Sequence, residues 1–205
     1  MMDIRLTHLL GILLMAAAFA CAVAKGSLPA RAQDDASIDQ FVAFLDQSVR
    51  AIHAQTGTTD EAIRAGCRDL MARILDLEAM ARDAAGESWD AMTQTQRAGY
   101  LSAFERRLLS DCVGPIRDYK GEPIALAGVR TVDGSERLVA IRFGPQDGAG
   151  RIITWRLHGA APNNLRVIDI IVDGRSTVAN LRSEFSAVLQ SQNGNIDLLI
   201  EFLRR

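Results

Sequence analysis

The chain has 205 residues, of which 48% are hydrophobic and 23% charged, and its formal net charge at pH 7 is −2. This composition is typical of a folded globular protein and excludes a disordered chain. The weakly acidic balance argues against binding to nucleic acid or to an anionic membrane surface through a basic patch.

The first residues have the parts of a secretory signal peptide. Arg5 and His8 precede the uncharged apolar run 9–20. This run is shorter than the roughly 20 residues that a membrane-spanning helix needs, and it suits the apolar core of a signal peptide. We therefore expect a signal peptide at residues 1–32 and a single mature domain at residues 33–205, whose net charge is about −4 because three basic residues and one acidic residue leave with the peptide.

Small residues give two candidate cleavage sites. Ala30-Arg31-Ala32 is the favoured A-x-A pattern, and Ala22-Val23-Ala24 is the second. Two alternatives remain open, a lipoprotein acylated at Cys21 and an uncleaved N-terminal anchor.

The N-terminal half of the mature domain is predicted to be helical. Ser37-x-x-Gln40 matches a capping box, and the apolar residues behind it recur at helical spacing as far as Thr56-Gly57. The later boundaries predicted in this half are Thr58-x-x-Glu61 at the start of a second helix, Asp76 before a short third helix, a break at 86–90, Thr93-x-x-Gln96 at the start of the longest helix, and Gly114-Pro115, which bends or ends it.

The C-terminal half changes to the period of strands. Four strands with short links are predicted at Ile124–Val132, Leu138–Phe143, Ile152–Leu157 and Leu165–Val172. Ser176 then caps a helix that Asn193-Gly194 stops, and a last short helix follows at 196–203. Short links imply an antiparallel meander, so the fold class is α+β.

Two cysteines remain after removal of the signal peptide. Cys67 and Cys112 lie on two different predicted helices. An exported compartment permits a disulfide between them, whereas two buried thiols that pack as small hydrophobic residues are the alternative.

Few residues suggest chemistry. His53 and His158 have no metal-ligating neighbour at helical spacing, and no nucleophile, phosphate-loop or dinucleotide motif is present. Asp169 and Asp173 share one face of the last strand, where they form either an acid–base pair or, as we favour, a solvated face that ends in a turn.

Two arginines follow the last strand. Arg175 and Arg182 could neutralise an anion, but we interpret Arg175 as a turn residue and Arg182 as a helix-surface or ion-paired residue.

Apolar residues on alternate strand positions give a clearer pattern, which fits either a packed core or a ligand cavity. The three rows are Val139, Ile141 and Phe143; Ile153, Trp155 and Leu157; and Ile168, Ile170 and Val172.

Several short motifs occur in a specific order between residues 74 and 203. They are ILD at 74–76, GESW at 86–89, TQTQR at 93–97 leading to Phe104, W-x-L at 155–157, VIDIIVDGRS at 167–176, NLRSEF at 180–185 and DLLIEFL at 197–203. Together they resemble the MlaC family of periplasmic lipid carriers, auxiliary components of a bacterial ABC transport system, and the resemblance covers roughly residues 36–204. The sequence departs from that pattern at Ala85, where a larger apolar residue is expected, and at Cys112, where an aromatic residue is expected.

The resemblance implies a curved antiparallel sheet wrapped by helices around an apolar cavity. It implies a periplasmic carrier that binds phospholipid, or a hopanoid-related lipid in a divergent branch, and that exchanges it between an inner-membrane ABC transporter complex and an outer-membrane lipoprotein complex. No catalytic residue, metal or cofactor is expected. The lipid-binding residues that we expect are Tyr100, Phe104, Leu108, Ile141, Phe143, Trp155, Leu157, Ile170, Val172, Val178 and Phe185.

Two other functions stay open. A small-molecule enzyme on a cone-shaped α+β fold would need Asp169 to face the cavity, although strand alternation directs it away from Ile168 and Ile170. An adaptor that only holds partner proteins together would have a solid core without a cavity.

Overall fold

The computed structural model describes residues 30–55, 59–145, 150–159 and 164–205. The expected signal peptide therefore lies outside the described residues, apart from its last three residues. The elements are α1 (Ala30–Gln55), α2 (Asp60–Ile74), α3 (Leu77–Ala85), α4 (Ser88–Ala91), α5 (Gln94–Arg117), β1 (Ile124–Asp133), β2 (Glu136–Phe143), β3 (Arg151–His158), β4 (Arg166–Val172), β5 (Arg175–Ser176), α6 (Thr177–Ser191) and α7 (Ile196–Leu203).

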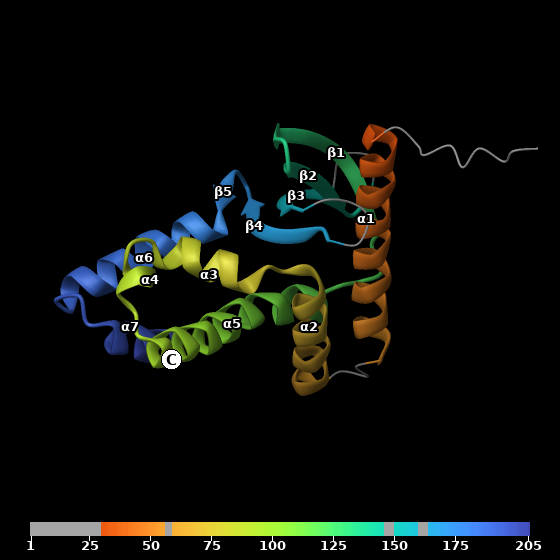
Figure 1. Cartoon of the computed structure of the whole chain (residues 1–205). Coiled ribbons are helices and arrows are strands. Elements are labelled where there is room, and N and C mark those ends of the chain that lie inside the picture. Colours follow the sequence, from red (N-terminus) through yellow and green to blue (C-terminus); the bar gives the residue numbers. More distant parts are fainter. Residues whose placement is uncertain (1–29, 56–58, 146–149, 160–163) are drawn as a thin grey trace, which may run out of the picture.

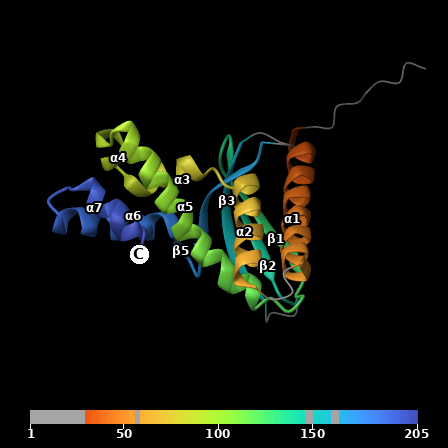
Figure 2. The same ribbon diagram turned by 90° about the horizontal axis from the view of Figure 1, so that it is seen from below.

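The fold is α+β, with one antiparallel sheet in the order β1-β2-β3-β4-β5. Helix α1 lies along the sheet at its β1 side, and α2 lies beside α1 (Figure 1). Helices α3, α4, α6 and α7 and the N-terminal half of α5 form a helical lobe beyond β4 and β5. Helix α5 runs from this lobe to the sheet, so one long helix belongs to both parts of the molecule (Figure 2).

The four predicted strands are confirmed to within two residues at each end, and β5 adds a fifth short strand. A tight turn joins β4 to β5, with positive φ angles at Asp173 (51°) and Gly174 (75°). Two successive positive φ values fit a type I′ hairpin turn, for which Asp-Gly is a preferred pair.

One predicted strand row is wrong at a single residue. The β3–β4 register pairs Arg156 with Asp169 and then Leu157 with Val167, so Ile168 is a bulge residue without a partner of its own. Val167 therefore takes the fully buried position that simple alternation gives to Ile168.

The predicted helices are confirmed, with local corrections at their ends. The Thr93 capping box is present, whereas Thr59, not Thr58, caps α2. Ser37 lies inside α1, because that helix begins earlier, at Ala30, and is the longest helix that the structure describes. Pro115 lacks an N–H for the helical ladder, yet α5 continues to Arg117.

Two further corrections concern the segment between α3 and α5 and the end of α1. The expected break at 86–90 contains the short helix α4, and Gly86 ends α3 with a φ angle of 56°. The expected stop at Thr56-Gly57 lies outside the described residues, and α1 ends at Gln55.

The helical lobe has an aromatic core. The ring centroids of Tyr100, Phe104 and Phe185 lie 5.9 to 6.4 Å from one another, and Trp89 stands edge-on to Tyr100 at 6.3 Å. Such aromatic contacts, most of which are edge-to-face, stabilise a core beyond the area that they bury. The Tyr100 hydroxyl donates a hydrogen bond to the Ala81 carbonyl at 3.0 Å, so its polar group is satisfied within this core.

Candidate ligand-binding site

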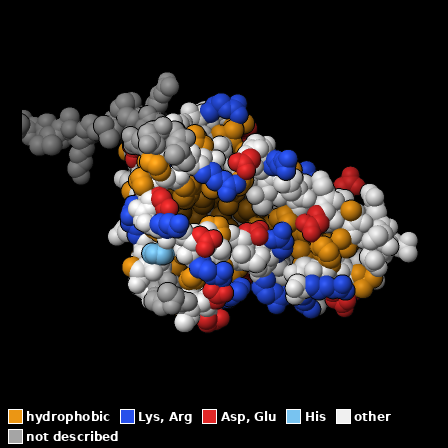
Figure 3. Space-filling model, turned by 180° about the vertical axis from the view of Figure 1, so that it is seen from behind, with side chains coloured by type: hydrophobic (Ala, Val, Ile, Leu, Met, Phe, Trp, Pro, Cys, Tyr) orange, Lys and Arg blue, Asp and Glu red, His pale blue; other side chains and the backbone are white. Residues whose placement is uncertain are grey.

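A cavity of about 640 Å³ lies between one face of the sheet and the helices α1, α2 and α5. Its volume falls within the range of about 300–1,000 Å³ that is usual for small-molecule sites. The surface is visibly hollowed, with apolar side chains inside and charged side chains around the opening (Figure 3). The apolar lining residues are Leu45, Val49, Leu70, Met71, Ile74, Leu75, Leu108, Cys112, Pro115, Ile116, Phe143, Pro145, Ile153, Trp155, Ile170 and Val172.

The sheet wall of the cavity follows from strand register. Trp155 lies opposite Ile170, and Ile153 lies opposite Val172, so these four side chains share one face of the sheet. Phe41 of α1 packs against Trp155 with ring centroids 6.0 Å apart at an angle of 69°. The indole is therefore held between a helix and the cavity, and Trp155 is only 8% exposed.

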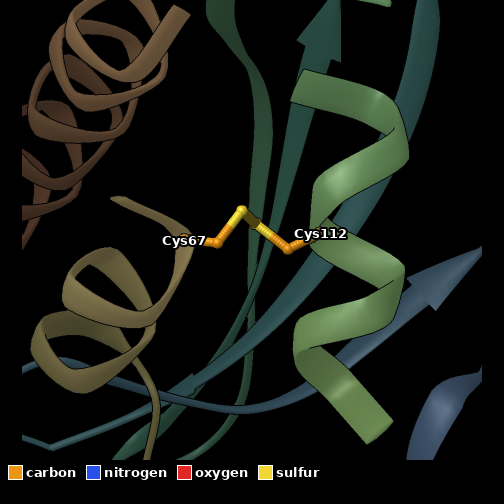
Figure 4. The surroundings of a disulfide bond; sticks show 2 residues. All are labelled: Cys67 and Cys112. Atoms are coloured by element: carbon orange, nitrogen blue, oxygen red, sulfur yellow. A yellow bond between two sulfur atoms is a disulfide. The ribbon is translucent and has the colours of Figure 1, made fainter. Parts of the chain in front are cut away.

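The helix wall is fixed by a disulfide bond. Cys67 of α2 and Cys112 of α5 are bonded, with their Cα atoms 6.2 Å apart (Figure 4). Cys67 is fully buried, and Cys112 contributes to the cavity lining. The disulfide therefore ties together the two helices that form this wall.

The opening carries four charged residues. They are Asp111 in α5, Asp118 at the C-cap of α5, Glu122 in the link between α5 and β1, and Arg151 in β3. N–H groups of Lys120 and of Glu122 itself donate to the Glu122 carboxylate and lower its pKa. Asp111 is paired with Arg107 at 2.8 Å, so Asp118 and Glu122 carry the negative charge on the α5 side, and Arg151 lies on the strand side.

The link after α5 is held to α1 by polar contacts. The Arg50 guanidinium reaches the carbonyls of Gly121 and Glu122, each at 3.4 Å, and the Tyr119 hydroxyl donates to the Glu122 carbonyl at 2.7 Å. Partial burial raises the pKa of Tyr119 above its ordinary value, although the nearby Arg50 opposes this change. These contacts fix one side of the opening.

Five of the eleven expected lipid-binding residues line the cavity: Leu108, Phe143, Trp155, Ile170 and Val172. The other six lie outside its lining, in the packed core: Tyr100, Phe104, Ile141, Leu157, Val178 and Phe185. Tyr100 and Phe104 share the apolar side of α5 with Leu108, but they lie in the half of the helix that belongs to the helical lobe.

Sequence reasoning missed the contributions of α1 and α2 to the cavity. Leu45, Val49, Leu70, Met71 and Ile74 belong to apolar helix faces that are visible in the sequence, yet the same periodicity describes core residues. The polar opening had no detectable signal, because it combines side chains from separate segments.

The candidate acid–base residues have structural roles. Asp169 is only 6% exposed, and its carboxylate accepts the N–H groups of Ile170 at 2.8 Å and Val178 at 3.1 Å. It thus helps to cap α6 and does not line the cavity, so its interpretation as part of a solvated face was wrong. Asp173 is exposed and forms an ion pair with Arg151 at 3.0 Å.

The histidines and Arg182 also have protein partners. His158 lies 2.9 Å from the carboxylate of Asp76, and His53 lies 3.3 Å from the carbonyl of Ile116. Arg182 forms an ion pair with Asp83, as the interpretation of a structural role predicted. The described residues contain no cluster of histidine, cysteine and carboxylate side chains that fits a metal ion.

Together, this sheet, its covering helices and the apolar cavity define an α+β protein built to enclose a hydrophobic ligand. The sequence matches the MlaC protein family over residues 40–205, and the chain belongs to that family.

Comparison with solved structures supports the fold. The chain is similar to the phospholipid-binding protein from Ralstonia solanacearum, solved in complex with a phospholipid, with a TM-score of 0.65 and 18% sequence identity over 86% of this chain and 95% of that one. A search of curated proteins gave no match. Among the described residues, no helix has the length and apolar character needed to span a bilayer.

Proposed function

We propose that this protein is a periplasmic carrier that binds a phospholipid in the cavity. The observation that supports this most directly is a cavity of about 640 Å³ whose walls are mostly apolar, with charged residues at its opening. Membership of the MlaC family and the fold shared with a phospholipid-binding protein agree with this function. The five expected residues that line the cavity, from Leu108 to Val172, are the ones that we propose contact the acyl chain.

A carrier needs such a cavity for energetic reasons. Each methylene group of an acyl chain that leaves a membrane for water costs about 0.8 kcal/mol, so a chain of about 16 carbons costs about 12 kcal/mol. An apolar cavity removes most of this cost without a chemical step. The protein then acts as a carrier and not as an enzyme, and it requires no cofactor.

The proposed route follows from the N-terminal sequence and the family. A signal peptide at 1–32 would direct export, and cleavage after Ala32 would release a soluble domain of residues 33–205. In the periplasm, the carrier would exchange lipid between an outer-membrane lipoprotein complex and an inner-membrane ABC transporter complex. A phospholipid is the favoured cargo, and a hopanoid-related lipid is the alternative.

Extraction of the purified mature domain with organic solvent, followed by mass spectrometry, tests the proposal. We expect phospholipid in the extract, and little of it in an extract of a variant whose cavity is filled, such as Ile170→Trp. Circular dichroism should first show that the variant is folded. An extract of the unmodified domain that contains no lipid would contradict the proposal.

A further inference from the structure

A second, polar pocket of about 370 Å³ adjoins the cavity. Val172, Asp173, Arg175, Thr177 and Asn180 line it, and two of these residues, Val172 and Thr177, also line the cavity. An apolar compartment therefore continues directly into a polar one. This arrangement matches an amphiphile whose chain lies in the cavity and whose headgroup lies in the polar pocket.

The charge of the polar pocket comes from Arg175. Asp173, the acidic residue of this pocket, is paired with Arg151. Among the described residues no ion pair involves Arg175, and its side chain is exposed at the surface. A guanidinium group is well suited to phosphate, because its N–H donors match the spacing of two phosphate oxygens.

Side chains, and not helix amides, would make the contacts in this pocket. The α6 N–H groups of Val178 and Ala179 already donate to Asp169 and Ser176, at 3.1 Å and 2.9 Å. The Thr177 hydroxyl and the Asn180 amide are further donor groups in the lining. The pocket thus offers a positive charge and neutral donors, as a phosphodiester requires.

The strand pairing places Arg175 on the cavity side of the sheet. Arg175 lies opposite Val172 in the β4–β5 pair, and Val172 lines both the cavity and the polar pocket. Residues that lie opposite each other in an antiparallel pair direct their side chains to the same face of the sheet. The Arg175 side chain therefore leaves the sheet on the same face as the cavity lining.

We propose that the polar pocket around Arg175 binds the phosphodiester of the lipid whose acyl chain occupies the cavity. This inference rests on the proposed function and specifies how the site selects its ligand. The acidic residues Asp118 and Glu122 on the opposite side of the opening disfavour phosphate there and so orient the headgroup toward β5 and α6. The carrier therefore distinguishes phospholipids from uncharged lipids with the same chains.

Binding of two matched lipids tests this inference. Delipidated mature protein is mixed with a fluorescent phosphatidylglycerol or with a diacylglycerol that carries the same labelled chains. Arg175→Gln should weaken phosphatidylglycerol binding roughly five- to tenfold, because the guanidinium is solvent-exposed, and should change diacylglycerol binding less than twofold. Arg175→Lys should restore part of the loss. The matched control is Arg130→Gln, which removes the same charge from the exposed surface of β1 and should leave both affinities unchanged.

The outcomes separate this inference from the proposed function. Equal phosphatidylglycerol affinities for the Arg175→Gln, Arg130→Gln and unmodified proteins would overturn the inference, whereas the carrier function would stand. An unmodified protein that binds neither lipid would overturn both. Free glycerol phosphate, added as a competitor at millimolar concentration, should not displace the lipid; displacement would show a site for soluble phosphate esters and would also overturn the inference.

Discussion

Cys67 and Cys112 form a disulfide that joins α2 to α5 at the wall of the cavity, over a separation of 45 residues. Helices α2 and α5 pack against each other, and one of the sulfur atoms of the bond belongs to a residue of the cavity lining. It therefore couples the stability of the domain to the shape of its proposed binding site.

Removal of this bond should destabilise the domain. The chain-entropy relation for a loop of about 45 residues predicts a loss of about 4 kcal/mol in the free energy of unfolding when both cysteines are replaced by alanine. Urea unfolding of the double variant measures this loss, and the unmodified protein in excess reductant is its control. Equal urea midpoints of unfolding for the oxidised and the reduced protein would contradict a stabilising role for the disulfide.

A carboxylate in the cavity should abolish lipid uptake. Ile170→Asp places a charge beside Trp155 and Val172, where an acyl chain would have to contact it, so uptake from labelled vesicles should fall at least about tenfold. Ile152→Asp is the matched control, because Ile152 is 43% exposed and does not line the cavity. Similar uptake by both folded variants would contradict the proposed location of the chain.

Asp169 should matter for stability and not for lipid binding. Asp169→Ala leaves the N–H groups of Ile170 and Val178 without their acceptor and should cost about 1–2 kcal/mol, whereas Asp169→Asn keeps an oxygen acceptor and should cost less. Chemical denaturation measures both values. Loss of lipid uptake by the folded Asp169→Asn variant would instead indicate a role in ligand binding.

Tyr100 should make the stability of the domain decrease in alkali. Burial raises the pKa of its hydroxyl well above the ordinary value, so the folded state keeps the proton that the unfolded state loses above pH of about 10. Its contribution to stability is therefore complete below this pH and decreases as the pH rises further. Tyr100→Phe should remove this part of the pH dependence and should cost about 1 kcal/mol at pH 7 through loss of the hydrogen bond to Ala81.

Thermal unfolding of both proteins between pH 7 and pH 11 measures the difference. If the difference in melting temperature between Tyr100→Phe and the unmodified protein stays constant over this range, ionisation of Tyr100 does not lower the stability of the domain in alkali, and the prediction is contradicted.

Local patterns predicted most of the fold. Alternation located the four long strands, and the cap residues Asp76, Thr93 and Ser176 located the starts of α3, α5 and α6, because these signals depend on neighbouring residues alone. The bulge at Ile168 had no such signal, since it arises from pairing with β3. The family resemblance supplied what the patterns could not decide, the choice between a packed core and a cavity.

The binding site was harder to predict than the fold. Leu108 and Phe104 have the same chemical character and lie on the same side of one helix, yet only Leu108 lines the cavity. Their difference depends on where α5 leaves the helical lobe and meets α2. The opening combines Asp118, Glu122 and Arg151, and only the folded chain brings these residues together.

The most direct test of the central claim is the transfer of labelled phospholipid by a protein of residues 33–205, the proposed mature domain. The donor and acceptor vesicles are separated by a membrane that passes the protein but not the vesicles. We predict that the delipidated domain takes up phospholipid in a fixed molar ratio and delivers it to the acceptor vesicles, and that the Ile170→Asp variant does not. Two results would contradict the claim that the protein carries lipid in this cavity. One is a transfer rate no higher than the rate without protein, and the other is an equal rate for the folded Ile170→Asp variant.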